Sequence, residues 1–83
     1  MNSNLNRRER KHLARVKGLP CSVCDVVGPS EAHHIRQGLP YLAVALCKSC
    51  HDALHGKGDK AMWRIYKRDE IDALAVTIER LLA

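Results

Sequence analysis

The pattern of apolar and polar positions predicts a chain of short elements, beginning with a helix over residues 7–17. Asn6 followed three positions later by Glu9 matches the polar pair that opens many helices, and Gly18 is a favourable stop. The apolar stripe of this helix is thin.

Residues 21–46 have no helical periodicity and instead predict a β-hairpin. Glycine and proline mark turns at 28–29 and at 38–40. A short strand is expected between these turns, over residues 30–35, and the apolar run over residues 42–46 predicts a second strand.

Three further helices are expected after the hairpin. The first spans residues 48–55 and ends at a glycine-rich turn, and the second spans 60–67 after Asp59. The last spans 70–82 after the capping residue Asp69. Its apolar positions at helical spacing, which predict its packing face, are Ile71, Leu74, Ile78 and Leu81. The elements together predict a mixed α+β fold in a single domain over residues 1–83.

Composition adds the expectation of a chemical staple. The chain has 83 residues with no Phe, one Trp and two Tyr, so its core is poor in large side chains. Domains of about 70–80 residues or fewer usually depend on a disulfide or a metal ion.

Charge separates the N-terminus from the rest of the chain. The formal net charge is +5, and residues 1–17 hold six of the 14 Lys and Arg residues but one of the nine acids. The charge of the rest of the chain, residues 18–83, is therefore balanced, with eight basic and eight acidic residues. Such a basic segment is either simply solvated or faces nucleic acid. Neither a membrane span nor a secretory signal is visible, which predicts a cytoplasmic protein with reduced cysteines.

The four cysteines form two C-x2-C pairs, Cys21 with Cys24 and Cys47 with Cys50. Paired spacing of this kind favours a tetrahedral zinc site, with two disulfides or an iron–sulfur site as the alternatives. A site with four thiolates is coordinatively closed and therefore structural. Metal binding would supply folding free energy on the order of 10 kcal/mol.

Four of the five histidines flank these cysteines. His33 and His34 are adjacent, so on a strand they point to opposite sides, whereas His51 and His55 share one face of the predicted helix. An i, i+4 pair of imidazoles can hold one metal ion. His12 stands apart and is expected to be an ordinary surface or core residue, with a phosphate contact as the alternative.

The ordered run of a first C-x2-C pair, "AHHI" and then "LCKSCHDALHG" resembles the HNH endonucleases of the ββα-metal (His-Me finger) superfamily, over about residues 21–56. The resemblance implies that a β-hairpin and a helix enclose one catalytic divalent metal ion, beside a separate structural zinc. The segments 1–17 and 59–83 would add a basic helix and two C-terminal helices. More loosely, the chain is similar to small phage nucleases, including the recombination-enhancement type, which leaves a recombination or other phage protein open as a partner.

Position by position, the resemblance implies that His34 is the general base and that His33 and His51 bind the catalytic metal. His55 matches an additional histidine of colicin-type members. Imidazole titrates near neutral pH, which suits a base that takes a proton from water. Imidazole ligands favour Mn²⁺, Ni²⁺ or Zn²⁺, while Mg²⁺ is compatible through water and substrate phosphate.

DNA is then the expected substrate and partner. Phosphate contacts are expected from Arg7, Arg8, Arg10, Lys11, Arg15, Lys17 and Arg36. One departure from the family pattern stands out, because Leu42 and Ala43 occupy the place of an asparagine that braces the loop of the base. A zinc module that binds DNA or protein without catalysis, and a structural zinc domain within an assembly, are the alternative functions.

Overall fold

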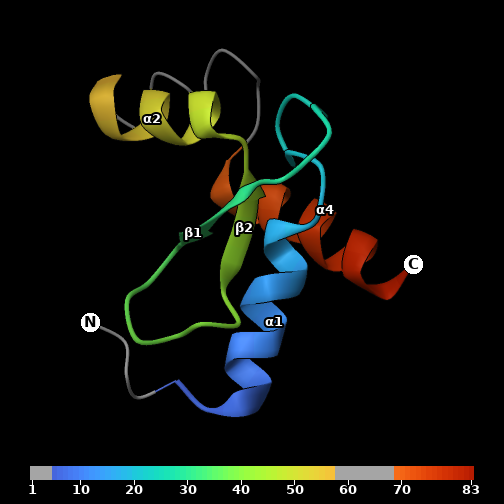
Figure 1. Cartoon of the computed structure of the whole chain (residues 1–83). Helices are drawn as coiled ribbons and strands as arrows, with labels where there is room; N and C mark the ends of the chain where they lie inside the picture. Colours follow the sequence, from blue (N-terminus) through green and yellow to red (C-terminus); the bar gives the residue numbers. More distant parts are fainter. Residues whose placement is uncertain (1–4, 58–68) are drawn as a thin grey trace.

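A computed structural model describes residues 5–57 and 69–83 and shows a mixed α+β fold. The elements in these residues are α1 (Arg7–Lys17), β1 (Glu31–His34), β2 (Ala43–Leu46), α2 (Lys48–Lys57) and α4 (Glu70–Leu82). The predicted helix over residues 60–67 lies outside the described residues. Figure 1 shows the hairpin in the middle of the molecule, with α1 and α4 packed against it and α2 continuing from the end of β2.

The two strands pair antiparallel, as the sequence predicted. Glu31 lies opposite Leu46 and His34 lies opposite Ala43, so the register is fixed over four residue pairs. Both strands lie within their predicted ranges. All four residues of β2 are buried, which makes this strand the centre of the fold.

The loop between the strands is closed by backbone hydrogen bonds. Ile35 N–H donates to the carbonyl oxygen of Leu42 at 3.0 Å, directly after the last strand pair. At the tip of the loop, Leu39 N–H donates to Arg36 O at 3.3 Å. Gly38 occupies the third position of this turn with φ +84°, a conformation that glycine adopts without a steric penalty. The turn predicted at residues 38–40 is confirmed.

Helix α1 begins and ends as its sequence predicted. The Asn6 side chain accepts from Glu9 N–H at 2.8 Å, and the Glu9 carboxylate accepts from Asn6 N–H at 2.9 Å. This reciprocal pair satisfies two of the amides that a helix start leaves without partners. Leu13 and Val16 are the buried residues of α1, so its thin stripe does face the core.

Helix α4 has the predicted bounds, but its packing face was predicted only in part. Leu74 is partly buried and packs against the core, as expected. Ile71 is 65% exposed and Ile78 is 43% exposed, whereas Ala73 and Thr77 are fully buried. The small side chain at Ala73 allows the helix to approach β2 closely. The hydrogen bonds of the buried Thr77 hydroxyl then set the rotation of α4 about its axis. These polar contacts decide which residues of α4 face the core, in place of the spacing of its apolar residues.

This hydroxyl network covers the edge of β2 that faces away from β1. Thr77 Oγ1 donates to Ala73 O at 2.9 Å and accepts from Ala45 N–H at 3.3 Å. Its 2.7 Å bond with Ser22 Oγ therefore has Ser22 as donor. Ser22 N–H also donates to Ala45 O at 2.8 Å. Both edge groups of Ala45 are thus satisfied without a third strand.

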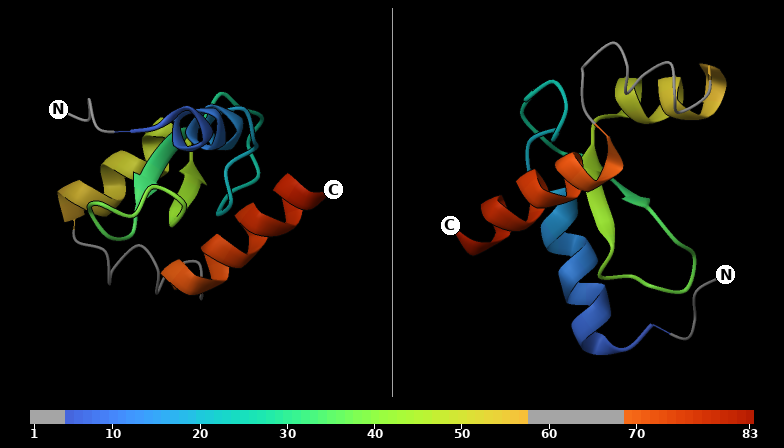
Figure 2. Two further views of the ribbon diagram at one scale, coloured as in Figure 1. Left: turned by 90° about the horizontal axis from the view of Figure 1, so that it is seen from below. Right: turned by 180° about the vertical axis from the view of Figure 1, so that it is seen from behind.

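Two arginines fix α4 to the N-terminal half of the chain. Arg15 donates to the Leu81 carbonyl at 2.6 Å, near the end of α4. Arg80 donates to Cys21 O at 3.2 Å and to the Asp25 carboxylate at 2.6 Å. Figure 2, seen from below and from behind, shows α4 running past α1 and the hairpin.

The buried core is small. The fully buried side chains of largest volume are Leu46, Val16, Val44, Thr77, Cys21 and Ser22. Half of them are hydroxyl or thiol residues, so apolar burial alone is modest. Helix α2 continues through Gly56 to Lys57, two residues beyond the predicted end. Among the described residues, no helix combines the length and the apolar character needed to cross a membrane.

The network around Thr77 makes a testable prediction. Thr77→Val keeps the shape of the side chain but removes the acceptor for Ala45 N–H and the partner of Ser22 Oγ. We expect a loss of about 1–3 kcal/mol in the free energy of unfolding, measured in urea. Thr77→Ser retains the hydroxyl and should lose clearly less; equal losses for both variants would contradict a dominant role for the hydrogen bonds.

Candidate metal centres

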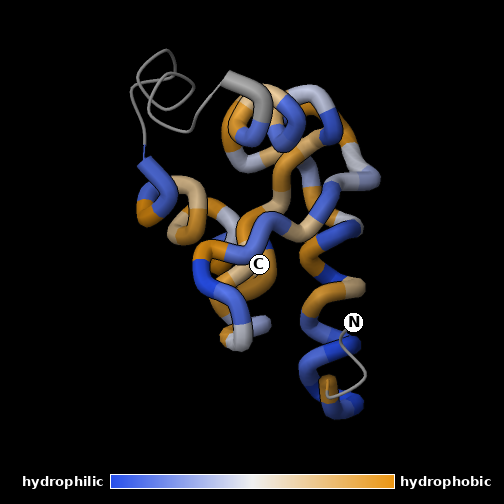
Figure 3. The backbone as a smooth tube through the Cα atoms, turned by 90° about the vertical axis from the view of Figure 1, so that its left-hand side faces the viewer, coloured by the Kyte–Doolittle hydropathy of each residue, from blue (hydrophilic) through white to orange (hydrophobic). Residues whose placement is uncertain are grey.

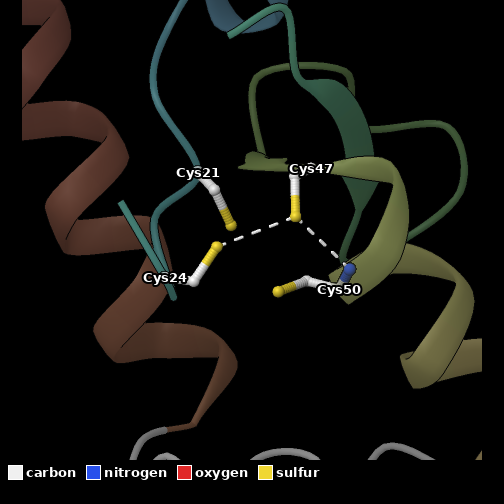
Figure 4. Close-up of side chains that lie close together, drawn as sticks. All are labelled: Cys21, Cys24, Cys47 and Cys50. Carbon is white, nitrogen blue, oxygen red and sulfur yellow. Dashed lines mark hydrogen bonds between the residues drawn. The ribbon is translucent and has the colours of Figure 1, made fainter. Parts of the chain in front are cut away.

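Four cysteines from distant positions converge on one point. Cys21 and Cys24 lie in the turn after α1, Cys47 follows β2, and Cys50 lies in the first turn of α2. Their sulfur atoms all lie within 4.8 Å of one another, and no disulfide joins them. Figure 4 shows the side chains directed toward a common centre.

The spacing of the thiols fits a tetrahedral metal ion. Cys24 Sγ and Cys47 Sγ are 3.8 Å apart. Four sulfurs at about 2.3 Å from a central zinc ion would be separated by about 3.8 Å. The cluster therefore has the donor set and the dimensions of a structural metal site, and it could bind zinc.

The pKa values of the thiols show why a cation suits this cluster. Burial raises the pKa of Cys21, but hydrogen bonds from the backbone amides of Cys24, Cys47 and Val23 outweigh it and lower the pKa to about 7. Burial raises the pKa of Cys50, as do its contacts with Cys47 and Cys21. At Cys24 the Val26 amide lowers the pKa, but burial and the neighbouring thiols raise it overall. One thiolate thus opposes ionisation of the next, and a divalent cation would relieve that repulsion.

Three histidines form a second cluster. His33 comes from β1, and His51 and His55 come from α2. One ring nitrogen from each lies within 4.8 Å of the others. Ring centroids are 4.7 Å apart for His51 and His55, and 5.3 Å apart for His33 and His51. The structure therefore brings together the three side chains that the sequence predicted as ligands of a catalytic metal.

The nitrogen atoms of this cluster fit a shared ion. His51 Nε2 and His55 Nε2 are 3.1 Å apart. Two imidazoles at about 2.0–2.1 Å from one ion would hold their nitrogens about 2.9–3.4 Å apart, for octahedral to tetrahedral angles. The two nitrogens of the His51–His55 pair are therefore separated by the distance expected for two ligands of one metal ion.

Two carboxylates accompany the histidines, and sequence reasoning missed both. His51 Nδ1–H donates to Glu31 Oε1 at 2.8 Å, and His33 Nε2–H donates to Glu70 Oε2 at 2.7 Å. Glu31 could have been found, because it lies two residues before His33 and therefore on the same side of β1. Glu70 has no local signal, since it lies 37 positions beyond His33.

His34 lies next to the cluster in sequence but is not part of it. It is the last residue of β1, is partly buried, and pairs with Ala43 across the hairpin. Because side chains alternate along a strand, His34 projects from the side of β1 opposite to His33. The group of mutually close donor atoms contains His33 but not His34.

The place of the expected asparagine is filled by apolar residues whose backbone closes the loop. Leu42 O accepts from Ile35 N–H at 3.0 Å, and Leu42 N–H donates to Leu39 O at 3.0 Å. The side chains at Leu42 and Ala43 cannot form the hydrogen bonds of an amide. At Leu42 the loop that follows His34 is therefore held by backbone hydrogen bonds and not by an amide side chain.

The predicted phosphate-binding residues are all exposed. Six of them, Arg7, Arg8, Arg10, Lys11, Arg15 and Lys17, lie on α1, and Arg36 lies in the loop after β1. Arg10 and Arg15 donate to the carbonyls of Leu5 and Leu81, so part of their hydrogen-bonding capacity is used within the protein. Figure 3 shows the hydrophilic first turns of α1 near the N-terminus.

His12 belongs to neither cluster. Its ring packs 4.8 Å from that of Tyr41, and burial, followed by the charge of Arg15, lowers its pKa. These contacts favour the ordinary packing role over a phosphate contact.

No known protein family, curated protein or solved structure matches this chain. The function is therefore inferred from the residues of the two clusters and their surroundings.

Replacing one thiol should separate the roles of the two clusters. We expect Cys47→Ser to lose the structural metal ion and much of the folded structure, since binding of such an ion contributes on the order of 10 kcal/mol. His55→Ala, in the other cluster, should keep that ion and the fold. Elemental analysis and circular dichroism check both. A folded Cys47→Ser protein without metal would show that the cysteines are not the staple.

Proposed function

We propose that this chain is a metal-dependent DNA endonuclease of the ββα-metal type, which hydrolyses phosphodiester bonds. The observation that carries the proposal is the convergence of His33, His51 and His55 from β1 and α2 on one point, with His34 adjacent on β1. β1, β2 and α2 follow one another in the chain, which is the element order that the HNH resemblance implies.

The histidine cluster has the donors for one catalytic divalent ion. His33, His51 and His55 would hold it, and the ion would offset negative charge on the scissile phosphate and on the leaving oxygen. Imidazole donors suit Mn²⁺, Ni²⁺ or Zn²⁺, and Mg²⁺ could act with substrate phosphate and water as further ligands.

His34 is the proposed general base. Its side chain lies on the opposite side of β1 from His33, so it is not committed to the cluster of nitrogen donors. The neutral imidazole of His34 would accept a proton from the water that attacks phosphorus, while His33 remains a ligand of the metal site. General-base catalysis of this kind contributes about 10²–10⁴-fold to a rate.

The four-cysteine cluster has a structural role in this proposal, with zinc as its metal. Four thiolates are the soft, closed donor set that zinc takes in structural sites. The cluster joins the turn after α1 to the start of α2, and Cys50 directly precedes His51. Zinc at the cysteines therefore supports the direction in which the α2 histidines point.

The exposed cations of α1 supply the proposed affinity for DNA. Arg7, Arg8, Lys11 and Lys17 are exposed and form no ion pair within residues 5–57 and 69–83. Each contact with a phosphate releases counterions, which gives affinity without sequence preference.

Substituting the proposed base tests the chemistry. His34→Ala should lower the cleavage rate of supercoiled plasmid about 10²–10⁴-fold with Mg²⁺, Mn²⁺ or Ni²⁺, while the metal content stays unchanged. Gln37→Ala changes an exposed, uncharged residue of the loop that follows His34. It is the matched control and should cut like wild type. If wild type leaves the plasmid intact with every metal, or His34→Ala cuts equally well, the nuclease proposal is wrong.

Removing charge from α1 tests the DNA interface. The double variant Lys11→Gln/Lys17→Gln should bind duplex DNA more weakly, and the slope of log affinity against log salt should fall by about 1.8. Lys48→Gln, which removes a cation that pairs with Asp52 on α2, should leave the slope near the wild-type value. Titrations of labelled DNA at several salt concentrations measure this. An unchanged slope in the double variant would show that α1 does not face phosphate.

A zinc module that binds DNA or protein without catalysis is the second candidate. The observation that favours it is the absence of an amide side chain at Leu42 and Ala43, where the family braces the loop of the base. Intact plasmid with all metals, together with salt-dependent DNA binding, would select this alternative.

A further inference from the structure

The hydrogen bond between His33 and Glu70 connects the histidine cluster to a helix outside the hairpin and α2. The two side chains meet at 2.7 Å, and His33 is 9% exposed in its side chain against 33% for Glu70. A nearly buried imidazole is thus held by a carboxylate from the first turn of α4. The motifs that carry the HNH resemblance lie within about residues 21–56 and do not include that helix.

This contact restricts which nitrogen of His33 can face a metal ion. A carboxylate oxygen accepts, so Nε2 of His33 carries a proton, and Nδ1 is the nitrogen left to bind a metal ion. Metal-bound histidines commonly donate their other ring N–H to a carboxylate, which fixes the tautomer and the ring orientation. Glu70 itself is not among the mutually close donor atoms, so its position is outside the ligand group.

We propose that Glu70 is a positioning residue of the histidine metal site: it holds His33 as the Nε2–H tautomer so that Nδ1 faces the ion, and thereby makes the site depend on helix α4. This inference rests on the proposed metal binding by His33, His51 and His55, and it adds a residue from α4 to that site.

The start of α4 is built to hold this carboxylate in place. Asp69 and Asp72 cap each other, with the Asp69 side chain accepting from Asp72 N–H at 2.8 Å. Glu70 follows the cap directly, and a helix N-terminus is a favourable place for negative charge. Further along α4, the bonds of Thr77 with Ser22 and Ala45 fix the helix against β2. His33 lies on β1, the partner of β2, so both residues of the hydrogen bond are anchored.

Two substitutions at Glu70 and one control test the role. Glu70→Ala removes the acceptor, whereas Glu70→Gln keeps an amide oxygen that can still accept from His33. Glu79→Gln removes the same charge from an exposed position of the same helix. The measurement is Ni²⁺ affinity of protein whose cysteine cluster is already loaded with zinc, by competition with a chromogenic chelator.

We expect Glu70→Ala to bind Ni²⁺ about 10–100-fold more weakly than wild type, Glu70→Gln to recover part of that loss, and Glu79→Gln to match wild type. Wild-type affinity in Glu70→Ala would overturn the inference. So would a wild type that binds no Ni²⁺, or a loss in Glu79→Gln as large as in Glu70→Ala. Equal losses in Glu70→Ala and Glu70→Gln would also overturn it, because the amide should still orient the ring.

Nitrogen NMR of the His33 imidazole shows which ring nitrogen carries the proton and which binds the metal ion. A contact with a purely structural role would not determine the metal-binding nitrogen. In wild type, His33 should be protonated on Nε2 and should bind Ni²⁺ or diamagnetic Zn²⁺ through Nδ1. In Glu70→Gln, which preserves the shape of the side chain and therefore the fold, the tautomer should become mixed. Binding through Nε2 in wild type would overturn the proposal.

Failure of this inference and failure of the proposed function are distinguishable. If wild type cuts plasmid but Glu70→Ala binds metal normally, only the role of Glu70 is wrong. If the Glu70 variants lose Ni²⁺ as expected but wild type cuts no DNA, the role of Glu70 stands and the nuclease proposal is wrong.

Discussion

The constraint on which the rest of this structure depends is the convergence of four thiols between the turn after α1 and the start of α2. The fully buried aliphatic side chains of appreciable size are few, with Leu46, Val16 and Val44 the largest. Apolar burial of that extent leaves a small domain close to marginal stability. The thiol cluster brings together segments more than 20 positions apart, and Cys50 directly precedes His51. A metal ion bound by these thiols would join the segments, and the direction of the α2 histidines would then depend on the same atoms that hold the fold together.

The second organising element is β2, which is buried along its whole length and satisfied at both edges. β1 pairs with one edge, and Ser22 and Thr77 bind the backbone of Ala45 at the other. This arrangement places α4 beside the hairpin without a third strand. The position of Glu70 beside His33 then follows from the same contacts, so the stability of the core and the order of the histidine cluster are linked through α4.

Features with local signals could be predicted from the sequence. The capping pair of Asn6 and Glu9, the paired cysteines and the i, i+4 spacing of His51 and His55 each operate within a few residues, and the structure reproduces them. The packing face of α4 could be predicted only at Leu74. Apolar spacing favoured Ile71, whereas hydrogen bonds to residues more than 30 positions away turn Thr77 inward. The partner of His33 was missed for the same reason, because no pattern within the chain relates it to Glu70.

The adjacency of His33 and His34 gains its meaning from the geometry of a strand. Successive side chains point to opposite sides, so one strand can offer a ligand to the cluster on α2 and a proposed base on its other side. A shift of register by one residue would exchange the two roles, since every side chain of the strand would change sides. The hydrogen bonds that close the loop at Ile35 and Leu42, and those that fix Ala45 against α4, oppose such a shift. Backbone closure thus orders the loop that follows His34, and the proposed division of labour between the two histidines depends on it.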